Sequence, residues 1–281
     1  LMGSMLVPPR KKSLAVDYPK LLARFLTSTY SPQEATDNRD GIKALAEMRA
    51  QCLSAAEAND TNIDNSVKYW AQISLLDKRI DFNQVGITFT WMDAFKGPTT
   101  LAPSQGKVTS TSLHLEIASV LFNSAVLAMT HGSTAHNDGN GGPEGLKTAA
   151  QSFKKAAGMF AGAAKATAKI ESSLSTDLSP ECLSLLETLC LGHAQRCFFE
   201  KAKGDNMKDG ILAKLASAVA HFYAQIGTSL SGPHAGEKIA KHFKGHAWIN
   251  DIAVEEAVFR AAAHSHAAQA VCIEKNGMEK G

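Results

Sequence analysis

Apolar residues recur every three to four positions along most of this chain, and that spacing predicts a mostly α-helical protein. Asp17 and Pro19 open a short helix, because a carboxylate can cap the free amides of the first turn and proline needs no amide partner there. Ser31-Pro32-Gln33-Glu34 is a capping box that starts a second helix, which is expected to continue toward Ala58. The same periodicity predicts helices at 62–79, 112–129 and 145–171, then a pair after Ser179 and two more stretches between Pro233 and Glu274.

The period changes to two at Val85–Trp91, where β-branched and aromatic residues alternate and predict a β-strand. A single strand needs a partner, and the extended segment 6–18 is the expected one. Residues 96–109 and 131–143 are expected to be loops. The predicted fold is mostly α, an array of helical hairpins similar to tetratricopeptide solenoids with a small antiparallel β-sheet near the N-terminus. We expect a single domain over 6–281, and the first five residues resemble an expression-tag remnant.

The stretch Ser179–Tyr223 has more apolar surface than one core requires. Its second helix has two apolar stripes instead of one apolar and one charged face. The first stripe is Leu212, Ala216, Val219, Tyr223 and Ile226, and the second is Ile211, Leu215, Ala218 and Phe222. Either neighbouring elements cover this helix on both sides, or the second stripe lines a groove that binds another molecule.

Composition narrows the function classes. The hydrophobic fraction of 44% and the charged fraction of 20% are typical of a soluble globular protein. A net charge of +2 argues against a dedicated nucleic-acid binder. No apolar run is expected to span a membrane, and no signal-peptide core follows the N-terminus. The 5 cysteines lie within apolar helical patterns without a Cys-x-x-Cys pair, so we expect buried, reduced thiols.

Motifs for catalysis and cofactor binding are incomplete. His242 and His246 share a helical face, but a zinc protease would need glutamate at position 243, where phenylalanine stands. The segments 232–238 and Gly106-Lys107 contain glycine and lysine, yet their spacing does not match a phosphate loop. No serine elbow or Cys/His pair is present. We therefore expect a protein that is not an enzyme and that has no metal or other cofactor.

Four stretches resemble, in order and spacing, motifs of the Alix-type BRO domain family. They are Phe89–Phe95 (FTWMDAF), Leu113–Asn123 (LHLEIASVLFN), Leu146–Phe160 (LKTAAQSFKKAAGMF) and Asp177–Glu181 (DLSPE). The similarity spans essentially Leu6 to Glu279. It implies the family's curved, banana-shaped helical array.

The resemblance also implies a function and its residues. The family's concave face binds an amphipathic helix from the C-terminal tail of an ESCRT-III subunit, in endosomal sorting, multivesicular body formation and membrane remodelling. This implies a cytoplasmic adaptor that is recruited to endosomes. The implied apolar contacts are Phe198, Ile211 and Leu215, and the last two lie one turn apart on the second stripe. Lys201, Lys208 and Lys214 are candidates for pairing with acidic residues of the bound helix, and Phe199 is expected in the core.

Alternative interpretations of these residues and of the function stay open. Phe198, Ile211 and Leu215 could belong to an ordinary core, and each lysine could be a solvated charge. The runners-up in function are a family-fold scaffold for a client outside ESCRT-III and a peripheral membrane binder that uses Arg10, Lys11 and Lys12, unless these form a solvated arm.

Arg196 stands where the family usually has an acidic residue, and Gly210 where it prefers alanine. The chain is also shorter than most members, so we expect the C-terminal end of the domain to be missing or reduced.

Overall fold

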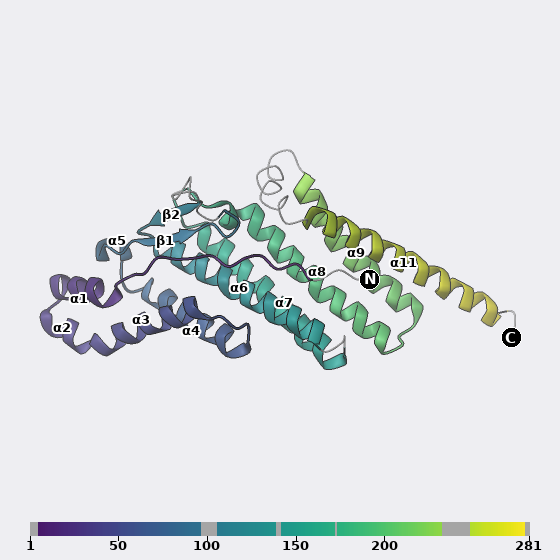
Figure 1. Cartoon of the computed structure of the whole chain (residues 1–281), viewed down its shortest axis with the longest axis horizontal. Coiled ribbons are helices and arrows are strands. Elements are labelled where there is room, and N and C mark those ends of the chain that lie inside the picture. The colour runs from purple at the N-terminus through teal and green to yellow at the C-terminus, as the bar shows by residue number, and fades with distance from the viewer. Residues whose placement is uncertain (1–4, 97–105, 139–141, 172, 232–247, 279–281) are drawn as a thin grey trace. The chain divides into compact units, whose positions relative to one another are not determined.

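The computed structural model describes residues 5–96, 106–138, 142–171, 173–231 and 248–278 (Figure 1). The chain divides into two compact units. Unit 1 consists of Leu1–Val7, Met129–Gly158 and Ser184–Gly281, and unit 2 consists of Pro8–Ala128 and Met159–Leu183.

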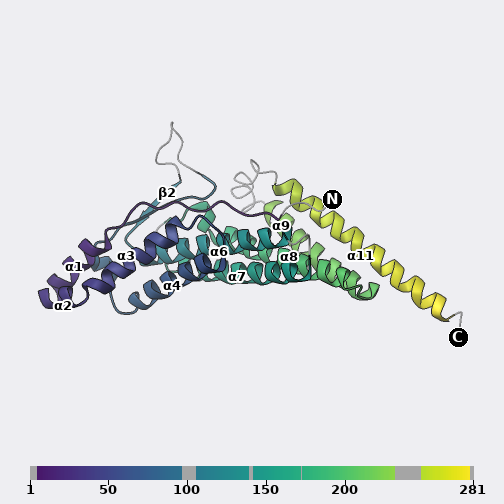
Figure 2. The same ribbon diagram turned by 60° about the horizontal axis from the view of Figure 1, so that its bottom comes forward.

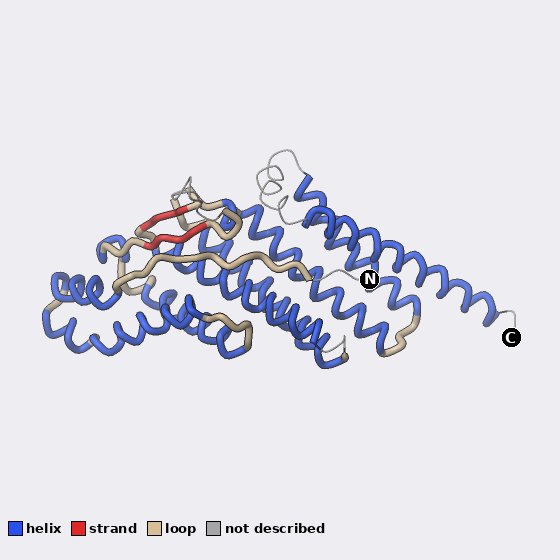
Figure 3. Tube along the Cα trace, in the orientation of Figure 1, coloured by secondary structure: helices blue, strands red, loops and turns tan. Residues whose placement is uncertain are grey.

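Both units are mostly helical, as predicted, and the strands found among the described residues form one small sheet (Figure 3). Unit 2 contains α1 (Tyr18–Thr29), α2 (Pro32–Asp37), α3 (Arg39–Ser54), α4 (Asp60–Leu76), α5 (Phe82–Val85), β1 (Phe89–Met92), β2 (Lys107–Ser110) and the short 3₁₀ helix η1 (Thr176–Leu178). Unit 1 contains α9 (Asp209–Ser231) and α11 (Trp248–Met278). Three long helices contribute residues to both units: α6 (Leu113–Asp138), α7 (Pro143–Thr167) and α8 (Pro180–Gly204).

The predicted helix starts in unit 2 are confirmed by their caps. The Asp17 carboxylate accepts a hydrogen bond from the Lys20 amide at 3.0 Å, and the Ser31 hydroxyl accepts one from the Glu34 amide at 3.1 Å. The single helix predicted from Ser31 toward Ala58 is wrong, because it is divided into α2 and α3 at Asn38. Figures 1 and 2 show α3 and α4 side by side, and α1 also packs on α3.

The sheet differs from the prediction in its partner strand. β1 pairs antiparallel with β2, with Phe89 opposite Ser110, so part of the stretch predicted as a loop is a strand. The N-terminal segment makes only an isolated bridge, Ser13 to Trp91, at the other edge of β1. The predicted strand also begins too early, because Val85 ends α5 and Gly86 adopts a left-handed φ of 72° before β1 starts.

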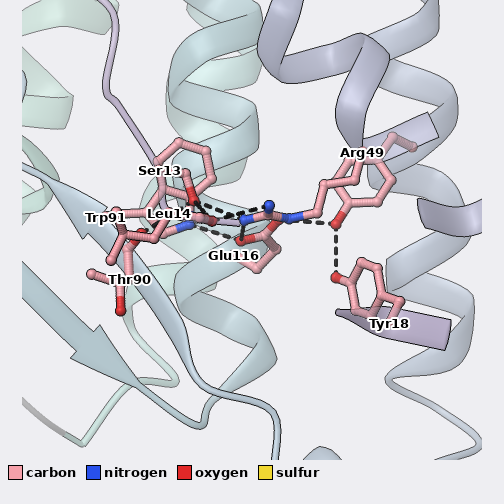
Figure 4. Close-up of polar contacts among 8 residues, drawn as sticks. Ser13, Leu14, Tyr18, Arg49, Thr90, Trp91 and Glu116 are labelled. Atoms are coloured by element: carbon pink, nitrogen blue, oxygen red, sulfur yellow. Dashed lines mark hydrogen bonds and ion pairs between the residues drawn. The ribbon is translucent and has the colours of Figure 1, made fainter. Parts of the chain in front are cut away.

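A buried polar cluster, the Glu116 cluster, holds together distant parts of unit 2 (Figure 4). Glu116 of α6 is 0% exposed and accepts hydrogen bonds from Arg49 at 2.8 Å and from the Trp91 indole at 2.7 Å. It also accepts one from Tyr69 at 2.9 Å. Arg49 in turn donates to the Ser13 hydroxyl at 2.7 Å. One carboxylate therefore connects α3, α4 and β1 directly, and the N-terminal segment through Arg49.

The N-terminal basic cluster is not a solvated arm, and that interpretation is wrong. Lys11 is 4% exposed, and its ammonium group pairs with the buried carboxylate of Asp177. Its backbone amide donates to the Asn123 side chain at 2.7 Å. Arg10 donates to the backbone carbonyls of Ala55 and Cys52, while Lys12 is exposed. The segment is thus fixed to unit 2 by charge-assisted hydrogen bonds.

In unit 1, α9 and α11 lie side by side (Figure 2) and enclose an aromatic core. Phe259 of α11 is 0% exposed, stacks on Tyr223 and meets Phe199 edge-on, with ring centroids 6.4 and 5.5 Å apart. His193 of α8 is buried beside this core, and its Nδ1 lies 3.0 Å from the Tyr223 hydroxyl. Burial lowers the pKa of His193 to about 3, so this imidazole is neutral at physiological pH.

Several sequence expectations about helix ends and exposure are wrong. Residues 131–138, predicted as a loop, continue α6, where Gly132 lies against the Phe153 ring and His131 contacts Ser152. Leu113–Asn137 is long and apolar enough to cross a membrane by composition, but the most apolar 18-residue window within it is 89% buried, as in a core helix. Four cysteines are buried, whereas Cys272 is exposed. Of the two helices expected after Pro233, α11 is described, and residues 232–247 lie outside the described residues.

Candidate partner-binding site

The two apolar stripes of α9 differ in burial. The first stripe is in the core, since Leu212, Ala216, Val219 and Tyr223 are all 5% exposed or less. On the second stripe, Ile211 is 44% exposed, while Leu215 and Phe222 are half-buried. The other elements of unit 1 therefore leave part of the second stripe open, as the surplus of apolar residues had indicated.

The neighbouring residues Phe198 and Phe199 of α8 point into different environments. Phe199 is 2% exposed and contacts Phe259, so its predicted place in the core is confirmed. Phe198 is 41% exposed. Successive residues of a helix face directions about 100° apart, so one phenylalanine can complete the core while the next remains at the surface.

The α8–α9 hairpin brings Phe198 near the second stripe of α9. At Gly192 the two helices come so close that an added Cβ would lie 3.2 Å from the Cβ of Phe222. The two helices of the hairpin run in opposite directions. A residue six positions after Gly192 on α8 is therefore level with a residue six positions before Phe222 on α9. Phe198 is thus level, along the hairpin, with the turn of α9 that contains Leu215.

The turn between α8 and α9 adds an apolar residue that the sequence analysis did not single out. Asn206 adopts a left-handed φ of 52°, which asparagine tolerates better than most residues. Met207 follows it and is 45% exposed. Met207, Ile211 and Leu215 are spaced four residues apart in the sequence. Met207 lies in the turn before α9, so the three residues do not all belong to one helix. Together with Phe198 they form what we call the hairpin surface.

The three candidate lysines lie around the hairpin surface in different states. Lys208 and Lys214 are exposed. Lys201 forms an ion pair with Asp205, one helical turn away at 2.5 Å. An exposed pair of this kind contributes only about 0.3–0.5 kcal/mol, so Lys201 can exchange its partner at little cost.

The departure at Arg196 is explained by a second buried ion cluster. Arg196 is 1% exposed and donates to Glu200 at 2.8 Å and to Glu255 of α11 at 3.2 Å, so it joins α8 to α11. His136 of α6 contacts the other oxygen of Glu200 at 2.6 Å. Burial opposes ionisation of Glu200, but the hydrogen bonds from His136 and Arg196 bring its pKa below the usual value. Arg196 is therefore part of the scaffold behind the hairpin surface.

Gly210, the other departure, lies in the first turn of α9, where an added Cβ would meet no atom within 4 Å. An alanine would fit there without any movement of the chain.

The described residues offer little for chemistry. Among them, no group of three or more His, Cys, Asp and Glu side chains could hold a metal ion. The His242 and His246 pair and the 232–238 segment lie outside the described residues. Burial raises the pKa of the Cys182, Cys190 and Cys197 thiols, which makes these cysteines poor nucleophiles.

Comparisons with known proteins agree on one family. The BRO1-like domain family matches residues 5–279. ALG-2 interacting protein X of Dictyostelium discoideum is 34% identical over 78% of this chain and 27% of its own length. Vacuolar protein-sorting protein bro1 of Aspergillus fumigatus is 33% identical over 87% of this chain and 23% of its own length. The chain thus spans less than a third of the length of these relatives.

A solved complex of the ALIX BRO1 domain with CHMP4C is similar over 98% of this chain and 75% of that chain. The TM-score is 0.84 at 26% identity. The helical fold with its small sheet, predicted from periodicity, is therefore a fold that this similar domain shares.

Proposed function

Because this chain belongs to the BRO1-like domain family, we propose that it is a non-enzymatic adaptor that binds the C-terminal amphipathic helix of an ESCRT-III subunit. The bound helix contacts Phe198, Ile211 and Leu215 on the hairpin surface, and Met207 extends that contact to the turn. The protein acts in the cytoplasm and is recruited to endosomes, where it takes part in cargo sorting, multivesicular body formation and membrane remodelling.

The observation that carries the proposal is the exposure of large apolar side chains beside a completed core. Phe198 and Ile211 are 41% and 44% exposed although Phe199 and Leu212 next to them are buried. An amphipathic helix that lays its apolar face on such a surface anchors through residues at i, i+3, i+4 and i+7. The similar ALIX BRO1 domain has been solved in complex with CHMP4C, which supports this class of partner.

The charges around the hairpin surface support the same class of partner, an amphipathic helix. Lys208 and Lys214 are exposed, and Lys201 is released from Asp205 at small cost. These cations favour a helix with acidic residues on its polar edge. Such pairs at the rim raise the association rate and are weakened by salt more than the apolar contacts are.

Leu215→Asp tests the proposal in a titration with the C-terminal helix peptide of CHMP4C. A charge at the half-buried centre of the hairpin surface should cost about 2 kcal/mol or more, which is roughly a thirtyfold or larger rise in Kd. Ser217→Asp is the matched control, because Ser217 is exposed on another face of α9 and receives the same charge. Far-UV circular dichroism and thermal melting check that both variants stay folded.

Two results would overturn the proposal. The first is a Leu215→Asp variant that unfolds together with an Ile211→Asp variant, at a more exposed position, that binds the peptide like the wild type. The second apolar stripe of α9 would then belong to the core. If wild type and variant bind anionic vesicles equally and neither binds peptide, the protein is a membrane binder instead.

A further inference from the structure

An apolar depression lies in unit 2, formed by residues of the N-terminal part of the chain. It has a volume of about 390 Å³ and runs along α3 between α1 and α4. Leu22 and Leu26 of α1 form one wall, Leu76 of α4 contributes to the other, and Ile42 and Leu45 of α3 form the floor. We call this depression the α3 groove.

The helices around the α3 groove pack on α3 without closing over it. α1 and α4 both contact α3, and a hydrogen bond of 2.8 Å joins Tyr18 of α1 to Tyr69 of α4. Gly41 lies at the groove in the first turns of α3, and an added Cβ there would meet no atom within 4 Å. Glycine destabilises a helix interior relative to alanine, so this position leaves space open at a cost to helix stability.

Polar groups gather where α1 ends and α3 begins. Tyr30 is 63% exposed and rests edge-on against Phe25, with ring centroids 6.3 Å apart. The Glu34 carboxylate accepts a hydrogen bond from Asn38 at 3.2 Å. Arg79, which follows α4, also lines the groove, and within the described part of the chain its guanidinium has neither an ion pair nor a hydrogen bond. The groove is thus apolar along its floor and has an unpaired cation at its rim.

We propose that the α3 groove binds a short amphipathic segment of a partner protein. The segment inserts apolar side chains between α1 and α4 and pairs an acidic side chain with Arg79. Arg79 provides the charge complementarity, because within the described residues its guanidinium has no ion pair and can therefore take an acidic side chain of the segment. The Glu34 carboxylate, whose donor Asn38 is a neutral amide, stays an anion in the same lining. The volume is within the range of ligand pockets, but the groove is open to solvent along one side, which suits one face of a peptide better than a lipid chain that needs enclosure.

A phage-displayed library of random dodecapeptides tests this proposal. The library is selected on the wild-type protein and depleted on Gly41→Trp, which is designed to fill the groove with an indole from a position where an added Cβ meets no atom within 4 Å. The matched control is Gly41→Ala, which leaves the groove open. We expect enriched peptides to carry two large apolar residues one helical turn apart and an acidic residue about one turn further along.

Synthetic copies of the enriched peptides then give the affinities. Arg79→Glu should weaken binding by roughly tenfold or more, whereas Gly41→Ala and Leu215→Asp should bind like the wild type. The Leu215→Asp result separates this groove from the hairpin surface, so either proposal can fail alone. The proposal is overturned if no enriched peptide distinguishes wild type from a folded Gly41→Trp, or if the enriched peptides lack acidic residues and bind Arg79→Glu equally well.

Discussion

In folded proteins charged groups are usually exposed and apolar groups buried, and two regions of this molecule depart from that pattern. The Glu116 cluster of unit 2 buries charged groups, whereas the hairpin surface of unit 1 exposes apolar side chains. In the Glu116 cluster a carboxylate and a guanidinium are almost completely buried, and hydrogen bonds of 2.8 and 3.3 Å join Arg49 directly to Glu116. On the hairpin surface, Phe198, Met207 and Ile211 are each more than 40% exposed.

The difference between these regions is what each one connects. The Glu116 cluster joins segments that are far apart in sequence, so removal of one member leaves the others buried without partners. On the hairpin surface the apolar residues are exposed, while Phe199 and Leu212 beside them are buried in the core of unit 1. Substitution within the Glu116 cluster should therefore change folding stability, whereas substitution on the hairpin surface should change binding.

The largest effect is expected from Glu116→Ala. Loss of the carboxylate leaves the buried Arg49 guanidinium uncompensated, which should lower the free energy of unfolding by about 3–5 kcal/mol. Urea denaturation followed by tryptophan fluorescence measures it, because Trp91 donates to Glu116. Glu47→Ala is the control, since the exposed Lys43–Glu47 pair on α3 contributes only about 0.3–0.5 kcal/mol. Equal losses in the two variants would contradict the assigned role of the cluster.

The two adjacent phenylalanines provide a matched test within unit 1. Phe199→Ala creates a cavity against Phe259 and should cost about 3–5 kcal/mol of stability. Phe198→Ala removes a side chain that is 41% exposed and should cost less than half of that. Thermal melting ranks the two variants, and the CHMP4C peptide titration should rank them in reverse. A Phe198→Ala variant that loses as much stability as Phe199→Ala would place Phe198 in the core.

The smallest effect is expected from pH. The hydrogen bond to Glu200 raises the pKa of His136, whereas partial burial and Arg196 act in the other direction. Because the folded pKa lies above the unfolded value of about 6.5, the stabilisation by this pair is complete below that pH. It is lost as the pH rises through the folded pKa.

His136→Gln should therefore reduce the melting temperature at pH 6 more than at pH 9. His221→Gln, at an exposed position on α9, serves as the control. A His136→Gln effect that is the same at both pH values would show that the imidazole contributes by packing alone. Buried His193, whose pKa of about 3 is below the unfolded value, acts in the opposite sense and destabilises the folded state as pH falls below about 6.5.

The part of the candidate site that could be predicted from sequence is the part set by helical periodicity. The two stripes of α9, the buried place of Phe199 and the positions of Ile211 and Leu215 follow from spacing within one hairpin. Met207 was missed because a turn, not a helix, places it beside Ile211. The role of each residue in binding stays a prediction until the titration is done.

The fold likewise has features that could be predicted from the sequence and features that could not. The caps at Asp17 and Ser31 could be predicted because a cap is a contact between residues three positions apart in the sequence. The strand pairing was not, since β1 could pair with either neighbouring extended segment by composition alone. The helical end of α6 depends on α7, against which Gly132 packs through Phe153.

The pattern of residues along the chain is enough to predict where most helices begin, which face of each is apolar, and that α9 has a second apolar stripe. Which charges are buried depends instead on contacts between distant parts of the folded chain. Lys11, Glu116 and Arg196 look like surface residues in sequence, and their partners Asp177, Arg49 and Glu255 are at least 59 residues away. Periodicity reports on the local backbone, whereas the free energy of a buried charge depends on donors and acceptors that only the folded chain brings together.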